Sequence, residues 1–340
     1  MAVMVTGGAG YIGSHAVKRL LEEGFDVLAV DNLYRGHAEA IAALQTIAEG
    51  RLAFSQTDVG DRDALIGLMR EHKIDTVMHF AALAYVGESV EEPLRYYRNN
   101  TASALSLLEA CDEIGIERFV FSSTCATYGE PPKVPMDEST PQSPISPYGM
   151  SKLHVEHMLR DYAHARRVAG KPFGYAALRY FNVAGSDPQT LIGEDHEPET
   201  HLIPVIIEAA LGIRDQIKIF GTDYDTPDGT CIRDYIHVCD LIDAHIAVMR
   251  ALQPGDERFY NLGIGKGYSV REIIESVRRV AGREFKVVET DRRPGDPAAL
   301  FADPSKINHE LGWSAKFVNI DDIVRTAWNW FESHPNGYES

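Results

Sequence analysis

The sequence predicts an α/β fold in which a Rossmann-type, doubly wound parallel sheet is joined by a smaller α/β lobe. Two observations support this prediction: a strand, a glycine turn and a helix open the chain over residues 2–23, and strands then alternate with helices as far as residue 122. This order of β–α–β units implies right-handed crossovers and a parallel sheet. The ligands of such sheets gather at the carboxyl ends of the strands.

The composition limits the size of the protein and the partners that it can have. With 340 residues and 44% hydrophobic content, the chain can build a large core in one or two domains. Its 33 Lys and Arg against 50 Asp and Glu give a net charge of −17, which disfavours nucleic acid or an anionic membrane as a partner. The sequence contains no apolar run of about 18 residues, the length that would predict a membrane helix. The four cysteines form no CxxC pair. We therefore expect a soluble, cytoplasmic protein with buried thiols.

The first strand and the first helix enclose a glycine-rich turn. Residues 2–6 form a short apolar run, Gly7, Gly10 and Gly13 follow it, and helical periodicity extends over residues 14–23. Glycines let the backbone turn tightly and approach a pyrophosphate, whose charge is met by N–H groups at the helix N-terminus. The arrangement predicts a dinucleotide-binding turn.

The second strand, residues 26–30, ends in Asp31, which lies 18 residues after Gly13. A carboxylate at this position can accept hydrogen bonds from both hydroxyls of an adenosine ribose, and it repels a 2′-phosphate. NAD is therefore favoured over NADP, although Arg35 lies nearby. The alternative role for Asp31 is to cap the turn that follows the strand.

The alternation of strands and helices continues beyond Asp31. The elements that we expect are strands at 52–57, 76–80 and 118–122 and helices at 62–72 and 101–114. The segments that come to lie at the carboxyl ends of these strands are 58–59, 80–82 and 122–124. A Pro-rich loop over residues 130–147 follows the last of them.

Tyr148 and Lys152 stand four positions apart at the start of a helix that begins with Pro147. This spacing puts both side chains on one helical face. A phenol has a pKa of about 10, and a lysine cation beside it favours the phenolate and moves the pKa towards the range in which proton transfer is efficient. The pair can therefore serve as an acid/base device, although such pairs also occur by chance on amphipathic helices.

Thr124 at a strand end, Tyr148-x-x-x-Lys152 and the TGGAGYIG turn together resemble the extended short-chain dehydrogenase/reductase superfamily. Within it, the chain is most similar to nucleotide-sugar 4-epimerases of the UDP-glucose (UDP-galactose) 4-epimerase type. The stretches that carry the resemblance are HFAALAYVGESV (79–90), SSTCATYG (122–129), SPYGMSK (146–152), LRYFNVAGSDP (178–188), DGTCIRDYIHVCDL (228–241) and RRPGD (292–296).

The resemblance implies a role for each matching residue. Tyr148 would be the base, Lys152 would tune it and bind the nicotinamide ribose, and Thr124 would hydrogen-bond to the reacting sugar hydroxyl. The positions implied to bind NAD are Gly7, Gly10, Tyr11, Ile12, Gly13, Asp31, Asn32, Asp58, Val59, Phe80, Ala81, Ala82, Asn99, Tyr148, Lys152 and Phe181. The best-known members of the family have a lysine where this chain has Ala84, so one polar contact to the cofactor is lost or supplied otherwise.

The same resemblance divides the chain into two lobes. Residues 1–181 and 231–266 would form the NAD-binding Rossmann domain, and residues 182–230 and 267–340 would form the nucleotide-sugar-binding lobe. The positions implied to bind the UDP-sugar are Thr124, Asn182, His201, Leu202, Phe220, Arg233, Arg293, Asp296 and Leu300. Two arginines can neutralise a diphosphate and an aspartate can accept ribose hydroxyls. His201 stands where Asn is frequent, and Leu300 stands where some members carry Tyr, so these departures leave the preferred sugar open.

The implied activity is the interconversion of UDP-galactose and UDP-glucose by transient, NAD-dependent oxidation at sugar C4, with a 4-keto intermediate and return of the hydride to the opposite face. The alternatives are a UDP-arabinose/UDP-xylose 4-epimerase, a decarboxylase of a UDP-uronate, a dehydrogenase that releases NADH, and a non-catalytic NAD-binding sensor. Dehydratases of the superfamily have an Asp-Glu pair where this chain has Cys125-Ala126, so dehydration is disfavoured. Family members are commonly homodimers, and we expect the same here. We expect no metal site, because the histidines at 154, 157 and 164 have no carboxylate at a fixed spacing.

Overall fold

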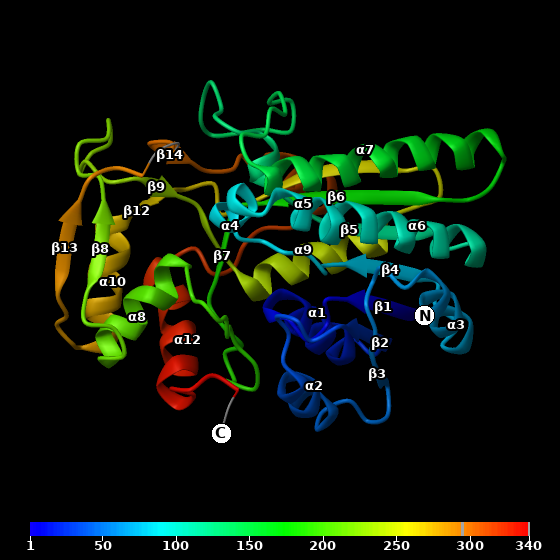
Figure 1. The fold of residues 1–340 in the computed structure, drawn as a ribbon, viewed down its shortest axis with the longest axis horizontal. Helices are drawn as coiled ribbons and strands as arrows, with labels where there is room; N and C mark the ends of the chain where they lie inside the picture. Colours follow the sequence, from blue (N-terminus) through cyan, green and yellow to red (C-terminus); the bar gives the residue numbers. More distant parts are fainter. Residues whose placement is uncertain (294–295, 339–340) are drawn as a thin grey trace. The chain divides into compact units, whose positions relative to one another are not determined.

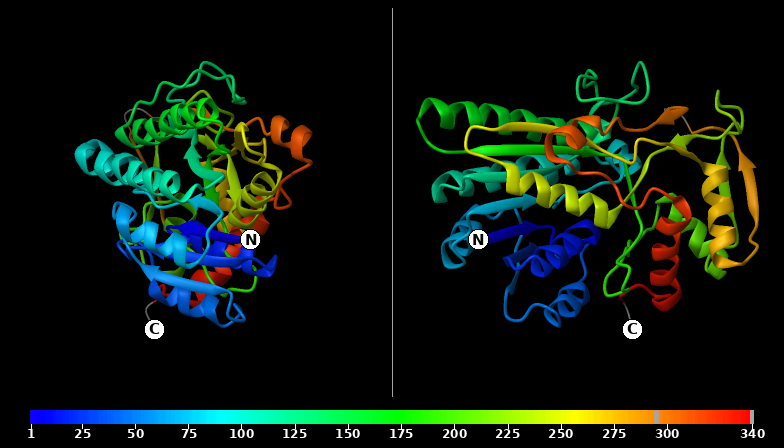
Figure 2. Two further views of the ribbon diagram at one scale, coloured as in Figure 1. Left: turned by 90° about the vertical axis from the view of Figure 1, so that its right-hand side faces the viewer. Right: turned by 180° about the vertical axis from the view of Figure 1, so that it is seen from behind.

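The computed structural model describes residues 1–293 and 296–338, and the chain divides into two compact units (Figures 1 and 2). The first unit comprises residues 1–130, 138–179 and 242–261, and the second comprises residues 131–137, 180–241 and 262–340. Four segments that the sequence analysis placed in the NAD-binding domain, 131–137, 180–181, 231–241 and 262–266, group with the second unit. The binding roles of the two lobes stay predictions.

The first unit is built on a seven-stranded sheet of strand order β11-β6-β5-β4-β1-β2-β3. Its strands are β1 (Ala2–Thr6), β2 (Asp26–Asp31), β3 (Leu52–Gln56), β4 (Thr76–His79), β5 (Arg118–Thr124), β6 (Gly174–Tyr180) and β11 (Glu257–Leu262). The pairs β1–β2, β1–β4, β2–β3 and β4–β5 are parallel, and Met4 is in register with Leu28 on one side and Val77 on the other. The reversal of strand order at β1 confirms the doubly wound Rossmann-type fold.

Helices cover the sheet of the first unit. They are α1 (Tyr11–Glu22), α2 (Ala38–Gln45), α3 (Arg62–Glu71), α4 (Val86–Glu91), α5 (Pro93–Tyr96), the π-helix η1 (Tyr97–Ala102), α6 (Ser103–Ile114), the 3₁₀-helix η2 (Cys125–Thr127) and α7 (Pro147–Val168). On one face, α3, α6 and α7 pack against the strands through a core that includes Leu65, Leu107, Leu159 and Phe119. Burial of this apolar surface is the main stabilising term for the layer.

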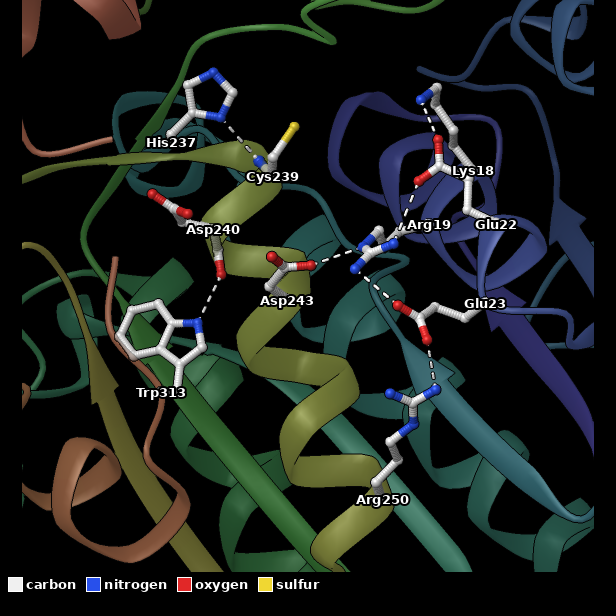
Figure 3. Close-up of polar contacts among 10 residues, drawn as sticks. All are labelled: Lys18, Arg19, Glu22, Glu23, His237, Cys239, Asp240, Asp243, Arg250 and Trp313. Carbon is white, nitrogen blue, oxygen red and sulfur yellow. Dashed lines mark hydrogen bonds and ion pairs between the residues drawn. The ribbon is translucent and has the colours of Figure 1, made fainter. Parts of the chain in front are cut away.

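On the other face, α1 lies against β1 and β2, and the part of α9 (Val238–Ala251) from Ile242 onward lies beside α1. Figure 3 shows the ionic contacts that join α1 to this part of α9. Arg19 binds Glu23 at 2.7 Å and Asp243 at 2.8 Å, and Arg250 binds Glu23 at 2.6 Å. These charges keep α1, which follows the glycine turn, in a defined position.

The second unit has small sheets and four helices among its described residues. The elements are β7 (Asn182–Ala184), α8 (Leu202–Leu211), β8 (Ile217–Phe220), β9 (Ile232–Arg233), β10 (Tyr235–His237), β12 (Tyr268–Ser269), α10 (Val270–Ala281), β13 (Val287–Thr290), β14 (Ala299–Leu300), α11 (Ser305–Leu311) and α12 (Ile320–Ser333). Helices α8, α10 and α12 share a core that includes Ile206, Ile273, Val324 and Trp330 (Figure 1). Over the described part of the chain, no helix combines the length and the apolar character needed to cross a membrane.

Three differences from the expected elements bear on function. Helix α1 begins at Tyr11 rather than at residue 14, directly after the extended residue Gly10. Strand β5 runs on to Thr124 rather than ending at residue 122, and its last three hydroxyl residues are buried. The π-helix η1 precedes α6 and begins at Tyr97, whereas the sequence predicts a helix only from residue 101. All three differences lie beside the candidate site.

Candidate active site

The turn between β1 and α1 requires glycine at two positions. Gly7 has a φ of +72°, and a Cβ atom on it would lie 2.7 Å from a backbone nitrogen of the loop after β4. A Cβ atom on Gly13 would collide with the carbonyl of Gly7. Gly10 is the N-cap of α1 and offers no side chain to the first turn, which starts with Tyr11 and Ile12. The backbone therefore forms a close cradle that fits a pyrophosphate at a helix N-terminus.

Asp31 is the buried last residue of β2. Its carboxylate accepts hydrogen bonds from the backbone N–H of Leu33 at 2.8 Å and of Ala9 at 3.1 Å. Burial raises the pKa of Asp31 above its ordinary value, and these two bonds partly oppose that shift. Because a carboxylate has about four acceptor positions, Asp31 both caps its turn and keeps acceptor capacity for ribose hydroxyls.

The polar segment after β3 meets the residue after Asp31. Asn32 donates a hydrogen bond to Asp58 at 2.8 Å, and Val59 beside it is buried. Phe80 directly follows β4 and places its ring 5.0 Å from that of His245. Four of the predicted cofactor positions, Asn32, Asp58, Val59 and Phe80, thus follow the carboxyl ends of strands at the same edge of the sheet.

The remaining predicted cofactor positions of the first unit lie nearby. Ala81 donates its backbone N–H to the carbonyl of Thr6 at the end of β1, at 3.1 Å, and Ala82 is half-buried beside it. Ala84 is exposed in the same loop. Asn99, in η1, donates to Asn100 at 2.9 Å.

Thr124 lies at the end of β5, where α7 closely approaches the chain. The Oγ1 atom of Thr124 accepts the backbone N–H of Ala126 at 3.1 Å. A Cβ atom on Gly149 would collide with the carbonyl of Ala126, so only glycine permits this approach of α7. Ser146 caps the helix by accepting the N–H of Gly149 at 3.2 Å.

Tyr148 and Lys152 are both buried in the first two turns of α7. Tyr148 packs in a small cluster with Leu83 and Tyr96, and the rings of the two tyrosines meet edge to face at 6.4 Å. Lys152 donates from Nζ to the carbonyl of Ser122 on β5 at 2.8 Å. The structure therefore brings the three predicted catalytic positions, Thr124 included, to one end of β5.

The electrostatics of Lys152 are those of a buried amine. Burial lowers its pKa to about 7. Burial, with the charge of Lys152 as the second cause, lowers the pKa of His79 to about 3, and the His79 ring instead shares a hydrogen bond with Thr6 at 2.7 Å. A lysine that titrates near neutral pH beside a buried phenol is suited to proton transfer. Cys125 and Ala126 after Thr124 supply no carboxyl group for an elimination.

The sequence analysis missed a buried ion pair that positions α7. Glu156, two turns after Tyr148, binds Arg179 of β6 through Nε at 2.9 Å and through Nη2 at 2.6 Å. The same carboxylate accepts Ser123 at 2.6 Å. Burial alone would raise the pKa of Glu156, but these partners outweigh burial and hold the pKa below its ordinary value. The pair ties α7 to both β5 and β6.

Within the second unit, three predicted substrate positions lie together. Arg233 of β9 forms an ion pair with Asp296 at 2.5 Å, and it is in register with Leu300 of the neighbouring strand β14. The loop that supplies Asp296 also holds Pro294 and Gly295 of the RRPGD motif, which lie outside the described residues.

The other predicted substrate positions of this unit form separate groups. The guanidinium of Arg293 lies 3.8 Å from the centre of the Phe220 ring. Asn182 is the exposed first residue of β7, directly after the buried Phe181, and Leu202 is the first residue of α8.

His201, the N-cap of α8, faces two glutamates. Its Nδ1 lies 2.8 Å from Glu199 and 3.1 Å from Glu194. Burial alone would lower the pKa of His201, but the charges and hydrogen bonds of the two carboxylates raise it to about 10. His201, which occupies a position where Asn is frequent in the family, thus lies in an acidic environment formed by Glu194 and Glu199.

Comparison with known proteins agrees with this geometry. A family model described as GDP-mannose 4,6 dehydratase matches residues 4–327. A UDP-glucose 4-epimerase of Halalkalibacterium halodurans is 47% identical over 341 residues, which cover 100% of this chain and 98% of that protein. A probable UDP-arabinose 4-epimerase 1 of Oryza sativa subsp. japonica is 47% identical over 342 residues, which cover 99% of this chain and 80% of that protein.

A solved structure extends the similarity to the fold. The crystal structure of UDP-glucose 4-epimerase from Bifidobacterium longum in complex with NAD+ and UDP superposes with a TM-score of 0.93 at 40% identity, covering 99% of this chain and 100% of that one. The predicted resemblance is confirmed: the chain belongs to the UDP-glucose 4-epimerase family of the extended short-chain dehydrogenase/reductase superfamily.

Proposed function

We propose that the protein is a UDP-glucose 4-epimerase that interconverts UDP-galactose and UDP-glucose. The observation that carries this proposal is the burial of Tyr148 and Lys152 on one face of α7, against the end of β5 that carries Thr124. The phenol of Tyr148, the amine of Lys152 and the hydroxyl of Thr124 are together suited to removing a proton from a sugar hydroxyl and returning it. The family membership of the chain supports the same reaction.

The cofactor of this reaction is NAD, and the first unit fits it. The cradle of Gly7 and Gly13 at the start of α1 suits the pyrophosphate, and Asp31 suits the adenosine ribose. When bound at these residues, NAD+ would supply reversible hydride transfer at sugar C4. Because both transfers occur within one complex, the net redox change is zero and no free NAD is consumed.

The residues of the chain supply proton transfer and positioning. Tyr148 accepts the proton of the C4 hydroxyl as a 4-keto sugar forms, and gives it back as that ketone is reduced on its opposite face. Thr124 holds the C4 oxygen by a hydrogen bond, and protonated Lys152 favours the phenolate of Tyr148. Arg233 and Arg293 hold the diphosphate while the sugar turns about its linkage.

A UDP-arabinose/UDP-xylose 4-epimerase is the second candidate. The identity of 47% to the rice protein equals that to the bacterial UDP-glucose 4-epimerase. Leu300 is smaller than the Tyr of some family members, so it leaves room at the sugar without distinguishing a hexose from a pentose. Both candidates use the same groups at C4.

The experiment compares the two sugars directly. Purified enzyme without added NAD is incubated with UDP-galactose or UDP-xylose, and the products are separated by ion-pair chromatography. We expect UDP-glucose from UDP-galactose, whereas conversion of the pentose alone would favour the second candidate. Bound dinucleotide without turnover of either sugar would overturn both and favour an NAD-binding sensor.

A variant pair tests the assigned base. We expect Tyr148→Phe to keep its NAD and to lose at least about 100-fold in kcat, because general acid–base catalysis contributes that much or more. Tyr162→Phe is the matched control, because it lies on the same helix and its hydroxyl donates to Asp112 on α6, at 3.1 Å. A near-normal rate of Tyr148→Phe would contradict the assignment.

The protein is also proposed to be a cytoplasmic homodimer. Helices α4, α5 and α6 expose apolar side chains at Val86, Val90, Leu94 and Leu105, and Leu94 is 81% exposed. We infer that these exposed apolar side chains contribute to a protein–protein interface. The four free cysteines are consistent with a reducing compartment. We expect a dimer by light scattering and a monomer for Leu94→Glu, and a monomeric unmodified protein would contradict the proposal.

A further inference from the structure

Four potential metal ligands converge in the segment before α8, in the second unit. Glu194, His196, Glu199 and His201 each offer one ligand atom, and these atoms all lie within 4.8 Å of one another. The two histidines are therefore directed at the same two carboxylates. The spacing in the sequence is Glu-x-His-x-x-Glu-x-His, which is separate from the helix histidines considered in the sequence analysis.

The distances suit a small tetrahedral cation. His196 Nδ1 lies 3.2 Å from Glu194 and 3.6 Å from Glu199, and His201 Nδ1 lies 3.1 Å and 2.8 Å from the same two residues. Bonds of about 2.0–2.2 Å in a tetrahedron separate neighbouring ligand atoms by roughly 3.3–3.5 Å. These His–Glu separations lie close to this range, and one ligand atom from each residue lies within 4.8 Å of the others, so side-chain rotation would bring the four atoms around one cation.

The local fold holds the ligands in place. The side chain of Trp330 on α12 donates to the carbonyl of Glu194 at 2.9 Å, and Gly193 is packed so closely on the Trp330 ring that a Cβ atom would collide with it. Glu199 accepts the backbone N–H of His201 at 2.7 Å, and Arg214 donates to the carbonyl of Glu199 at 3.0 Å. Contacts of this kind orient metal ligands and contribute to affinity.

The charges of the cluster also match a divalent cation. The side chains of Glu194 and Glu199 are 3% and 4% exposed, so two negative charges are buried and must be balanced. A divalent ion held by two neutral imidazoles would supply that balance.

We propose that Glu194, His196, Glu199 and His201 form a structural site for a divalent transition-metal ion of the Zn²⁺ class. Imidazole and carboxylate ligands favour Zn²⁺, Co²⁺ or a similar ion over Mg²⁺ and Ca²⁺, which take oxygen ligands. Four protein ligands close the coordination shell, as in structural rather than catalytic sites. The ion would fasten the loop of residues 194–200 to the start of α8.

This site is compatible with the predicted contact between His201 and the sugar nucleotide. Only Nδ1 of His201 faces the carboxylates, and its side chain is 39% exposed. The other ring nitrogen therefore stays outside the cluster. A bound ion would fix the orientation of this ring at the N-cap of α8.

The test uses the full-length, tag-free holoenzyme, treated with chelator and then titrated with Co²⁺. We expect one Co²⁺ per chain with the intense visible absorption of tetrahedral coordination, lost when Zn²⁺ displaces it. We also expect Zn²⁺ to raise the melting temperature, because an ion that binds the folded state stabilises it. Mg²⁺ should neither abolish the Co²⁺ absorption nor raise the melting temperature. Absence of the tetrahedral spectrum, or a melting temperature raised by Mg²⁺ and not by Zn²⁺, would overturn the proposal.

Variants show whether these residues hold the ion. We expect His196→Gln to bind Zn²⁺ at least about tenfold more weakly than the unmodified enzyme. His309→Gln, an exposed histidine on α11, is the matched control and should bind normally. Glu194→Gln is a second, more conservative ligand variant in case His196→Gln does not fold. Equal Zn²⁺ affinity in Glu194→Gln and the control would assign the binding to other residues and refute the site.

Discussion

The buried pair of Glu156 and Arg179 gives the strongest prediction for the positioning of α7, the helix that carries Tyr148 and Lys152. Glu156→Gln keeps the size of the side chain and removes its charge. In the native protein the carboxylate accepts four hydrogen bonds, two from Arg179, one from Ser123 and one from Gln142 at 3.0 Å. The amide NH₂ of glutamine cannot accept a hydrogen bond, so one side of this network loses its acceptor.

The magnitude follows from burial. The side chains of Glu156 and Arg179 are 0% and 4% exposed, so the substitution leaves a buried cation without its counter-charge. Breaking one partner of such a pair costs about 3–5 kcal/mol. We expect about 3 kcal/mol less free energy of unfolding, at the lower end of that range, because the remaining oxygen of the introduced glutamine still accepts a hydrogen bond. We also expect kcat to fall more than KM rises, because α7 carries Tyr148 and Lys152.

Urea unfolding of the variant and of the unmodified protein measures the loss. The matched control is Glu113→Gln, because Glu113 and its ion-pair partner Arg70 are 47% and 60% exposed, respectively. This substitution should change the free energy of unfolding by less than about 1 kcal/mol. The double variant Glu156→Leu/Arg179→Met should recover much of the stability, because it removes both buried charges. An effect of Glu156→Gln no larger than that of the control would refute the reasoning.

The pH dependence gives a second readout of the same pair. Burial would raise the pKa of Glu156, but Arg179, Ser123 and Gln142 together hold it below its ordinary value. The stabilisation is therefore present above the unfolded pKa of about 4.3 and is lost as the pH falls through the folded pKa. The stability difference between the unmodified protein and Glu156→Gln should narrow over that acidic range and stay constant from pH ~6 to ~8. A difference that instead grows on acidification would contradict the assigned charge state.

Three further substitutions test the site. Gly149→Ala places a Cβ atom against the carbonyl of Ala126 and should displace α7. We expect the variant to fold and its kcat in the epimerase assay to fall at least about tenfold. A normal kcat would contradict this expectation. Asp31→Asn removes the charge that repels a 2′-phosphate, so the affinity ratio of NAD to NADP should fall, and an unchanged ratio in calorimetry would assign the selectivity elsewhere. Burial lowers the pKa of Lys152 to about 7, so its protonation opposes folding most strongly below that pH. With NAD bound, Lys152→Met should be inactive. In dinucleotide-free protein, the variant should melt higher than the unmodified chain at pH ~6, and the difference in melting temperature should narrow towards pH ~9.

The order of strands and helices in the first unit could be predicted because each element has a local signal. The apolar run of β1, the glycine turn and the periodicity of α1 are all contained in residues 2–23, and the structure places β1 at the predicted residues. The C-terminal end of β5 was harder to predict from the sequence. Ser123 and Thr124 have the composition of a loop, and contacts with α7 together with the neighbouring strands bury this end of β5.

The chemical groups of the candidate site could also be predicted, because Tyr148 and Lys152 are neighbours on one helix. The groups that position them could not. Glu156 and Arg179 are 23 residues apart and meet only after β6 has joined the sheet. A glutamate within an amphipathic helix resembles a solvated residue, so no local pattern marks it as buried.

The cluster of Glu194, His196, Glu199 and His201 is a second group that no local sequence pattern predicted. The segment of residues 186–201 is rich in Asp, Glu, Pro and His, a composition that is typical of an exposed insertion. In the structure, Trp330 anchors Glu194 from more than a hundred residues away and both carboxylates of the cluster are buried. The two carboxylates converge with two imidazoles, and this convergence makes the segment a better place to look for a cation than the regularly spaced histidines of α7. Metal analysis of the purified enzyme therefore tests whether burial, rather than spacing, identifies such sites.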